Sequence, residues 1–258
     1  MSVRHPCKRF AWVRWPALAL AAGIFAAWPA IADNVLINLE WRPAAQTVTV
    51  GVPVEIGLYA VSSQNQQTAG MRVCLEWDSE HLDLLGVDND GPYPWLFSGL
   101  RPDDPLNEPL TDGTGLYRAM AQFGVPAVVT PEGLLLTTVE FTGLTATPVT
   151  AVTIPLALED QTTVAWGWTP PNVVLTGTLG AATVTLRPLL RGDLNCDGLV
   201  NAFDIDPFVL ALLNQLVYRE AFPTCNAMNG DINQDGLVNA FDIDPFIECL
   251  LSQNHQCP

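Results

Sequence analysis

Two segments of the 258-residue chain carry oxygen-bearing side chains at the same spacing. The first runs from Asp193 to Asp204, and the second runs from Asp231 to Asp242, 38 residues later. In each segment Asp, Asn, Asp, Asn and Asp occupy positions 1, 3, 5, 9 and 12, and Gly occupies position 6. Calcium takes six to eight hard oxygen ligands, and a short loop with a sharp turn at position 6 wraps them around one point. The spacing therefore predicts two calcium loops, 193–204 and 231–242.

The ligands of each predicted ion follow from the loop positions. Positions 1, 3 and 5 offer side-chain oxygens, position 7 offers its carbonyl, position 9 binds directly or through water, and position 12 closes the sphere bidentately. The predicted ligands are Asp193, Asn195, Asp197, Leu199, Asn201 and Asp204, and then Asp231, Asn233, Asp235, Leu237, Asn239 and Asp242. An acidic turn whose side chains bond their own backbone is the alternative for one such loop. Two complete copies favour two Ca²⁺ ions.

Two features distinguish these segments from the common EF-hand. Position 12 is Asp in both loops, where the common pattern has Glu, and no clear helix precedes either loop. Residues 188–258 resemble the type I dockerin domain, a tandem of half EF-hands in which one helix follows each loop. The resemblance implies a module without catalytic activity that binds a cohesin-domain protein when calcium is present. It also implies a role in an extracellular or cell-surface assembly, such as a cellulosome, that degrades polysaccharides.

In the dockerin family, loop positions 10 and 11 and the following helix contribute to the choice of partner. Here those loop positions are apolar, and the resemblance implies partner contacts through Ala202, Phe203, Ala240 and Phe241. Packing of both Phe side chains in the small core of the module is the alternative. Leu210 and Glu248 occupy equivalent helix positions and break the symmetry of the repeats, on what we expect to be an outer face.

Each loop is followed by a segment with the pattern of a short helix. Asp206 before Pro207, and Asp244 before Pro245, suit an N-cap followed by the first helical position. Apolar residues then recur at helical spacing, which predicts that one face of each helix packs against the other helix. The predicted faces consist of Phe208, Leu212, Leu213 and Leu216 in the first helix and Phe246, Ile247, Leu250 and Leu251 in the second.

Four of the six cysteines fall in the predicted C-terminal module. Such a density in a small exported module is typical of disulfide cross-links. The spacing favours Cys196 with Cys225 and Cys249 with Cys257, although four cysteines allow three pairings. Zinc is disfavoured because no C-x-x-C pair is present. Cys74 is left as either a buried thiol or an intermolecular link.

Residues 1–32 have the pattern of a secretory signal peptide. Basic residues precede an apolar run over 17–27, and the small residues Ala30 and Ala32 predict cleavage before Asp33. The run is short for a bilayer span, no cysteine for a lipid anchor follows the cleavage site, and no later segment has the length and apolarity of a membrane helix. We therefore expect a secreted or cell-surface protein.

The charge of the processed chain would be strongly negative. Loss of residues 1–32 leaves seven basic and 27 acidic residues, a formal charge of −20, and no lysine. Nucleic acids and anionic membranes are bound by basic patches, so we expect neither as a partner. Part of the acidity belongs to the loops, each of which brings three aspartates toward one point. Without a cation these carboxylates repel one another, which predicts that calcium stabilises the module.

Residues 33–187 have the pattern of an all-β domain. Apolar residues alternate from Val48 to Ala60 and from Met71 to Trp77. Further strands are expected at 134–141, 149–156, 173–178 and 182–186, with a long loop over 88–112. The pattern predicts an antiparallel β-sandwich of the jelly-roll type.

The order of these segments resembles that of cohesins and of related carbohydrate-binding β-sandwiches. The resemblance rests on 70–85, where a strand, an acidic turn and a Leu-rich strand follow one another, and on 133–141. A cohesin-like sandwich would give the chain both halves of a docking pair, which allows self-association.

Two other functions of the sandwich are alternatives. Aromatic rings would bind a polysaccharide, with Trp95, Trp166 and Trp168 as the candidates for exposure, whereas Trp77 is expected in the core. A dockerin-bearing glycoside hydrolase would need two carboxylates about 5 to 10 Å apart. No spacing singles out such a pair among Glu76, Asp78, Glu80, Glu132 and Glu140. We therefore expect a protein without catalytic activity.

Overall fold

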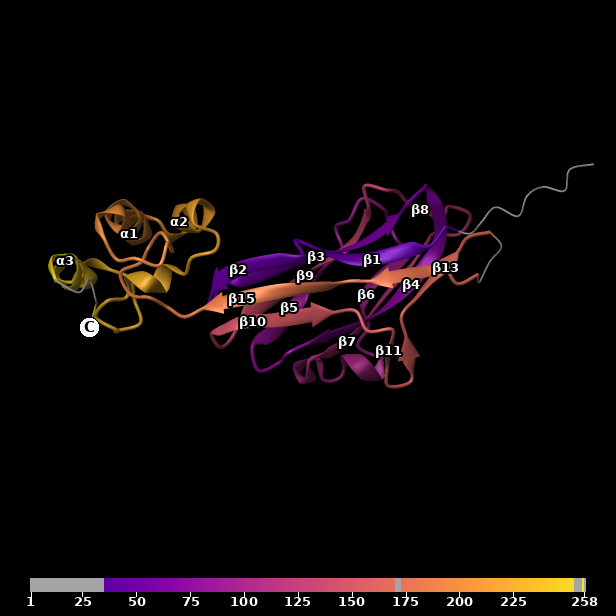
Figure 1. The fold of residues 1–258 in the computed structure, drawn as a ribbon, viewed down its shortest axis with the longest axis horizontal. Helices are drawn as coiled ribbons and strands as arrows, with labels where there is room; N and C mark the ends of the chain where they lie inside the picture. Colours follow the sequence, from indigo (N-terminus) through magenta and orange to yellow (C-terminus); the bar gives the residue numbers. More distant parts are fainter. Residues whose placement is uncertain (1–34, 170–172, 253–256, 258) are drawn as a thin grey trace, which may run out of the picture. The chain divides into compact units, whose positions relative to one another are not determined.

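The computed structural model describes residues 35–169, 173–252 and 257 of the chain. The predicted signal peptide lies outside the described residues. Strands make up the described chain as far as Arg187, and only short helices follow (Figure 1). The β domain followed by a few short helices agrees with the predicted fold class. Within the described residues, no helix has the length and apolarity needed to cross a membrane.

One sheet of the sandwich has five strands in the order β14-β1-β3-β9-β5. Its members are β14 (Thr176–Leu179), β1 (Ile37–Arg42), β3 (Pro53–Ser62), β9 (Leu134–Gly143) and β5 (Leu82–Asp88). The pairs are antiparallel except for β1 and β14, which are parallel.

The other sheet has the order β2-β15-β10-β4-β7-β6, and two further strands, β13 and β8, also pair with β4. Its members are β2 (Ala45–Thr49), β15 (Ala181–Arg187), β10 (Thr147–Thr153), β4 (Gln66–Trp77), β7 (Thr114–Met120), β6 (Phe97–Leu100), β13 (Val164–Gly167) and β8 (Ala127–Val129). A small hairpin consists of β11 (Ala157–Leu158) and β12 (Gln161–Thr162).

Three expectations for the sandwich need correction. The sheets are not wholly antiparallel, because β15 and β2 also form a parallel pair. The alternation from Val48 to Ala60 is not one strand: the chain turns at Gly51, which has a φ of 80°, and β2 and β3 enter different sheets. The expected loop over 88–112 contains β6 and two 3₁₀ turns, η1 (Pro105–Asn107) and η2 (Leu110–Asp112).

A single hydrophobic core joins the two sheets. The alternate residues of β4 from Met71 to Trp77 point into it, as predicted. Trp77 on the eight-stranded sheet meets Phe141 on the five-stranded sheet edge to face, with ring centroids 5.6 Å apart. The other side of β4 therefore faces away from this core.

The C-terminal residues form a small module of two repeats. A 3₁₀ turn leads into the helix after each loop: η3 (Ala202–Asp204) into α1 (Ile205–Leu213), and η5 (Ala240–Asp242) into α3 (Ile243–Leu251). The connection between the repeats contains α2 (Gln215–Ala221) and the 3₁₀ turn η4 (Ala227–Gly230), and the additional helix α2 was not predicted.

The predicted N-caps of α1 and α3 are wrong. Each helix begins one residue before the expected aspartate, at Ile205 and Ile243. The capping occurs at the preceding 3₁₀ turn, where the Asn201 side chain and the Asp204 side chain bond to each other's backbone N–H groups. Asn239 and Asp242 repeat the arrangement. The same side chains thus close the loop and start the helix.

The core of the module is smaller than the sequence pattern predicts. Phe208 and Phe246 are buried with ring centroids 4.3 Å apart, and Tyr218 of α2 is buried with them. The predicted packing of Leu213, Leu216, Ile247 and Leu251 is wrong, because all four side chains are exposed. The core that Phe208, Phe246 and Tyr218 share also includes Leu194 and Ile232 of the loops, and the four exposed side chains lie outside it.

Candidate functional site

The first predicted calcium loop is organised by the aspartates at its two ends. Asp193 and Asp204 are buried, and their carboxylates accept five backbone N–H groups. Asp204 Oδ1 accepts from Leu194 at 2.8 Å, and Asp193 Oδ2 accepts from Gly198 at 2.9 Å. Position 12 is thereby joined to positions 2, 3 and 9, and position 1 to positions 5 and 6. The loop closes on itself around these two carboxylates.

The second loop repeats this bonding pattern with its own residues. Asp242 Oδ1 accepts from Ile232 at 2.8 Å, and Asp231 Oδ2 accepts from Gly236 at 3.1 Å. The predicted turn at position 6 is present in both loops, and Gly198 and Gly236 adopt the left-handed conformation there, with φ values of 90° and 87°. No neighbouring atom would obstruct a side chain at either glycine, so backbone conformation alone requires glycine there.

The remaining predicted ligands are brought together in part. The side chains at positions 3 and 5 bond to each other, Asn195 to Asp197 at 3.1 Å and Asn233 to Asp235 at 3.0 Å. At position 9 the Asn201 Oδ1 accepts from the backbone N–H of Phe203 at 2.8 Å. Among the described residues, no three Asp, Glu, His or Cys side chains form a metal-binding group by themselves. The donor set is a mixture of aspartate, asparagine and, by position, the Leu199 and Leu237 carbonyls.

The electrostatics of the first loop fit a bound cation. Burial raises the pKa of Asp193, and backbone donors only partly oppose it, while the charges of Asp204 and Asp197 raise it further. Burial likewise raises the pKa of Asp204. No ion pair among the described residues joins a loop carboxylate to an arginine. Buried carboxylates need a compensating charge, and an all-oxygen donor set suits calcium.

The apolar residues of the loops lie on the surface of the module. Phe203 is 79% exposed and Phe241 is 78% exposed, so the alternative that these rings pack in the core is wrong. Ala202 and Ala240 beside them are also exposed. Solvent exposure is what the predicted partner contact requires of these four residues.

The exposed apolar residues continue along both helices in matching pairs. On α1 they are Ile205, Val209 and Leu213, and on α3 they are Ile243, Ile247 and Leu251. Leu213 and Leu251 are each 80% exposed. Residues four apart lie on one helix face, so each helix carries an apolar stripe. The sequence pattern had assigned part of this stripe to the core.

The asymmetric pair predicted for the outer face needs a correction at one position. Glu248 on α3 is exposed, as expected. Leu210 on α1 is half-buried and packs against the core of the module. Only Glu248 therefore interrupts the otherwise matched surfaces of the two helices.

Two disulfides cross-link the module with the pairing that spacing favours. Cys196 is bonded to Cys225, and Cys249 is bonded to Cys257. Cys196 occupies position 4 of the first loop, so this bond fixes that loop to the segment before η4. Cys74 is a free, buried thiol whose pKa is raised by burial, which excludes the intermolecular link considered for it.

We expect the longer disulfide to contribute more to stability. The bonds join residues 29 and 8 positions apart. Restriction of the unfolded chain then predicts a loss of about 3.5 kcal/mol for the Cys196→Ser and Cys225→Ser double variant, against about 2.5 kcal/mol for Cys249→Ser with Cys257→Ser. Urea unfolding at a fixed calcium concentration measures both values. A larger loss for the shorter loop would contradict this account.

The tryptophans considered for sugar binding have different surroundings. Trp77 is buried in the core, as predicted. Trp95 is half-buried and packs edge to face on Tyr93, with ring centroids 4.7 Å apart. Trp166 is half-buried beneath the Arg72 guanidinium, and Trp168 is also half-buried.

The acidic residues considered for hydrolysis lie on several separate elements. Asp78 and Glu80 belong to one exposed turn, in which the Glu80 N–H donates to Asp78 Oδ1 at 3.0 Å. This is the solvated turn that the sequence suggests. Glu76 lies on β4, Glu132 lies in the turn before β9, and Glu140 lies on β9.

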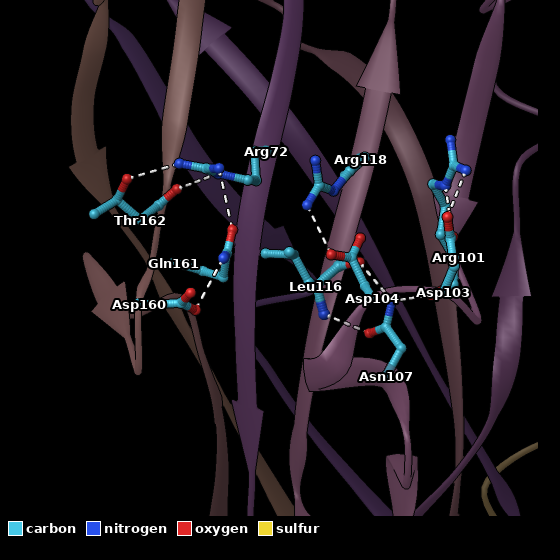
Figure 2. A network of polar contacts seen from close by, with 10 residues as sticks. All are labelled: Arg72, Arg101, Asp103, Asp104, Asn107, Leu116, Arg118, Asp160, Gln161 and Thr162. Atoms are coloured by element: carbon cyan, nitrogen blue, oxygen red, sulfur yellow. Dashed lines mark hydrogen bonds and ion pairs between the residues drawn. The ribbon is translucent and has the colours of Figure 1, made fainter.

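An arginine cluster on the outer side of the eight-stranded sheet was missed by the sequence analysis. Arg72 on β4 and Arg118 on β7 lie on neighbouring strands (Figure 2). Arg118 donates to the buried carboxylate of Asp104 at 2.7 Å, and Asn107 holds the adjacent turn through the backbone of Leu116. The sequence signal was weak because 46 residues separate the two arginines.

No family model matches the chain, and no curated protein matches it. Solved structures of similar fold are cohesin modules. The cohesin of a Clostridium perfringens family 33 glycoside hydrolase is 12% identical, with 60% of this chain and 98% of that chain covered and a TM-score of 0.45. The seventh ScaB type I cohesin of Pseudobacteroides cellulosolvens is 13% identical, with 59% of this chain and 93% of that chain covered and a TM-score of 0.46.

A third example is the sixth cohesin of Acetivibrio cellulolyticus scaffoldin B, whose structure was determined in complex with a dockerin. It is 13% identical, with 58% of this chain and 99% of that chain covered and a TM-score of 0.46. All three are similar to this chain in fold, and at these identities the similarity indicates no activity or partner for it.

Proposed function

We propose that the chain is an exported docking protein without catalytic activity. In this proposal the C-terminal module binds two Ca²⁺ ions in loops 193–204 and 231–242. Its loop phenylalanines and helix stripes then bind a cohesin-domain protein of an extracellular polysaccharide-degrading or cell-surface assembly. The two disulfides favour an oxidising, extracellular setting.

The observation that carries the proposal is the duplicated exposed apolar surface. Five exposed apolar residues of the first repeat have an exposed apolar counterpart 38 positions later; the pairs are Leu199 and Leu237, Phe203 and Phe241, Ile205 and Ile243, Val209 and Ile247, and Leu213 and Leu251. Contiguous exposed apolar surface is disfavoured in an isolated soluble module and marks sites of protein association. Its duplication points to a partner rather than to incidental exposure.

The loops connect metal binding to this surface. Phe203 lies two residues after the capping residue Asn201, whose side chain accepts a hydrogen bond from the Phe203 backbone N–H, and the same turn contains Asp204. A cation held by Asp204 and Asn201 would therefore fix the backbone that carries Phe203. Asn239, Phe241 and Asp242 repeat the connection. Partner binding is accordingly expected to depend on calcium.

Affinity capture tests the proposal. The mature chain, immobilised on resin, is exposed to the secreted proteins of its source in calcium and, separately, in excess EDTA. The expected result is retention of a protein that carries a cohesin domain, identified by mass spectrometry, in calcium only. Retention of that protein equally in EDTA would contradict the calcium-dependent mechanism. Retention of no cohesin-bearing protein in either condition would contradict the docking function.

A further inference from the structure

We propose that the outer side of the eight-stranded sheet holds a binding site for a negatively charged sugar ring, such as a uronic acid residue of an oligosaccharide. The site consists of Arg72, Arg118, Trp166, Phe97 and Met120 around Gly70. It lies on the sandwich, so it depends on neither the calcium loops nor the docking function proposed above.

Strand register assembles the site from four strands. Trp166 of β13 pairs with Gly70 of β4, Gly70 pairs with Met120 of β7, and Met120 pairs with Phe97 of β6. Paired residues on neighbouring strands point to the same side of a sheet. This row of paired residues therefore places the rings of Trp166 and Phe97 on opposite sides of Gly70. These residues line a pocket of about 310 Å³.

Gly70 forms the floor of this pocket. A side chain at that position would collide with the backbone carbonyl of Ala119 on β7. The close approach of the strands therefore requires glycine, and the absence of a side chain leaves a hollow between Trp166 and Met120. The hollow is a consequence of how β4 packs against β7.

The next row along the strands supplies the charge. Arg72 pairs directly with Arg118 in the β4 and β7 register. Like charges directly opposite each other on a sheet destabilise it. Arg118 forms an ion pair with Asp104, but the Nε atom of Arg118 is buried without a hydrogen-bond partner. Asp104 therefore compensates one of the two guanidinium charges, and an anion bound beside Arg72 would compensate the other.

Arg72 has no carboxylate partner among the described residues. Its guanidinium donates to the Thr162 carbonyl at 2.9 Å, to Thr162 Oγ1 at 2.9 Å and to Gln161 Oε1 at 3.1 Å, all neutral groups (Figure 2). The nearby Asp160 accepts from Gln161 instead. The β11–β12 hairpin thus holds the Arg72 guanidinium in place without neutralising its charge. A positive charge is retained here in a processed chain with a formal charge of −20.

The shape and chemistry of the pocket select the class of ligand. Guanidinium groups bind carboxylates with strong, directional hydrogen bonds. Half-buried Trp166 and partly exposed Phe97 offer apolar ring surface beside the arginines. A ring with apolar faces and one carboxylate satisfies both features. The volume is at the lower end of small-molecule sites, whereas a protein partner would need about 800 Å² of surface.

Isothermal titration of the mature chain with tetragalacturonate tests the proposal. Cellotetraose serves as the neutral oligosaccharide, inorganic phosphate as the simple anion, and an Asp- and Glu-rich peptide as the acidic macromolecular segment. Binding of tetragalacturonate alone, weakened by salt and unchanged by EDTA, is the expected result, because the arginines and not the calcium loops supply the attraction.

Three variants locate the site. Arg72→Gln and Phe97→Ala are each expected to weaken tetragalacturonate binding by about tenfold or more, since the first removes a charge-assisted hydrogen bond and the second removes ring contact. Arg219→Gln is the matched control, because Arg219 is exposed on α2 of the C-terminal module and does not line the pocket. Unchanged melting temperatures establish that the variants are folded. If Arg72→Gln does not fold, Phe97→Ala still tests the site.

Several outcomes would overturn the proposal. Equal binding of cellotetraose would remove the role of charge, and equal binding of phosphate would leave an anion site without ring recognition. Binding of the acidic peptide but not tetragalacturonate would assign the face to a protein partner. Absence of tetragalacturonate binding, or binding that Arg72→Gln and Phe97→Ala leave unchanged, would exclude this pocket.

Discussion

Excess EDTA is expected to destabilise the C-terminal module, with weaker helical circular dichroism and a lower melting temperature, while the stability of the sandwich is unchanged. The buried carboxylates of Asp193 and Asp204 have no cationic side chain to pair with among the described residues. A ligand that binds only the folded state contributes about 4 kcal/mol at a concentration 1,000-fold above its dissociation constant. Differential scanning calorimetry in calcium and in EDTA measures the difference.

Two variants separate the contribution of the calcium ion to stability from that of the Asp204 hydrogen bonds. Asp204 accepts three backbone N–H groups, so its replacement destabilises the loop even without calcium. Asp204→Asn keeps an acceptor oxygen but loses the charge and the bidentate carboxylate. Its destabilisation is therefore expected to be larger in calcium than in EDTA. Asp206→Asn, an exposed aspartate outside the loop, is the control. Identical melting of the wild-type chain with and without EDTA would exclude a stabilising calcium ion.

Replacement of both loop phenylalanines is expected to abolish partner binding without loss of stability. Central aromatic residues of protein interfaces contribute about 2 kcal/mol or more each, so Phe203→Ala with Phe241→Ala should weaken binding by at least about 30-fold. Because both rings are largely exposed, their removal leaves no cavity, and the melting temperature should change little. Titration of the captured cohesin partner with the variant provides the measurement.

The matched control is Phe123→Ala, because Phe123 is an equally exposed phenylalanine on the sandwich. Each single loop variant is informative as well. If one repeat at a time contacts the partner, either single variant retains binding and only the double variant loses it. If both repeats make contact together, each single variant is weakened. Full binding by the double variant would remove the apolar surface from the docking mechanism.

Local spacing allowed the most detailed predictions. All side-chain to backbone contacts that close a predicted calcium loop span at most ten residues, such as Asp204 to Leu194, so the positions of the oxygen-bearing side chains specify the closed loop. The same holds for the buried side of β4, because alternation along one strand predicts which residues face the core. The two disulfide pairs also follow the shorter chain separations.

Features that depend on contacts between residues far apart in the sequence were not predictable in the same way. The helical pattern of α1 and α3 contains more apolar residues than the small core accommodates, and only the packing of α2 and the loops decided that Phe208 is buried and Leu213 is exposed. Similarly, alternation does not specify strand direction, so the parallel pairs β1 with β14 and β15 with β2 were missed.

The sequence by itself determined two closed acidic loops and a β domain, because short-range spacing and alternation specify each of them. It favoured the observed disulfide pairing, and the structure decided among the three possible pairings. Tertiary structure alone decided which apolar residues form the exposed surface of the module. It also decided that Arg72 lies opposite Arg118, beside Trp166. The physical reason is that cross-strand register brings together residues whose separation along the chain carries no periodic signal.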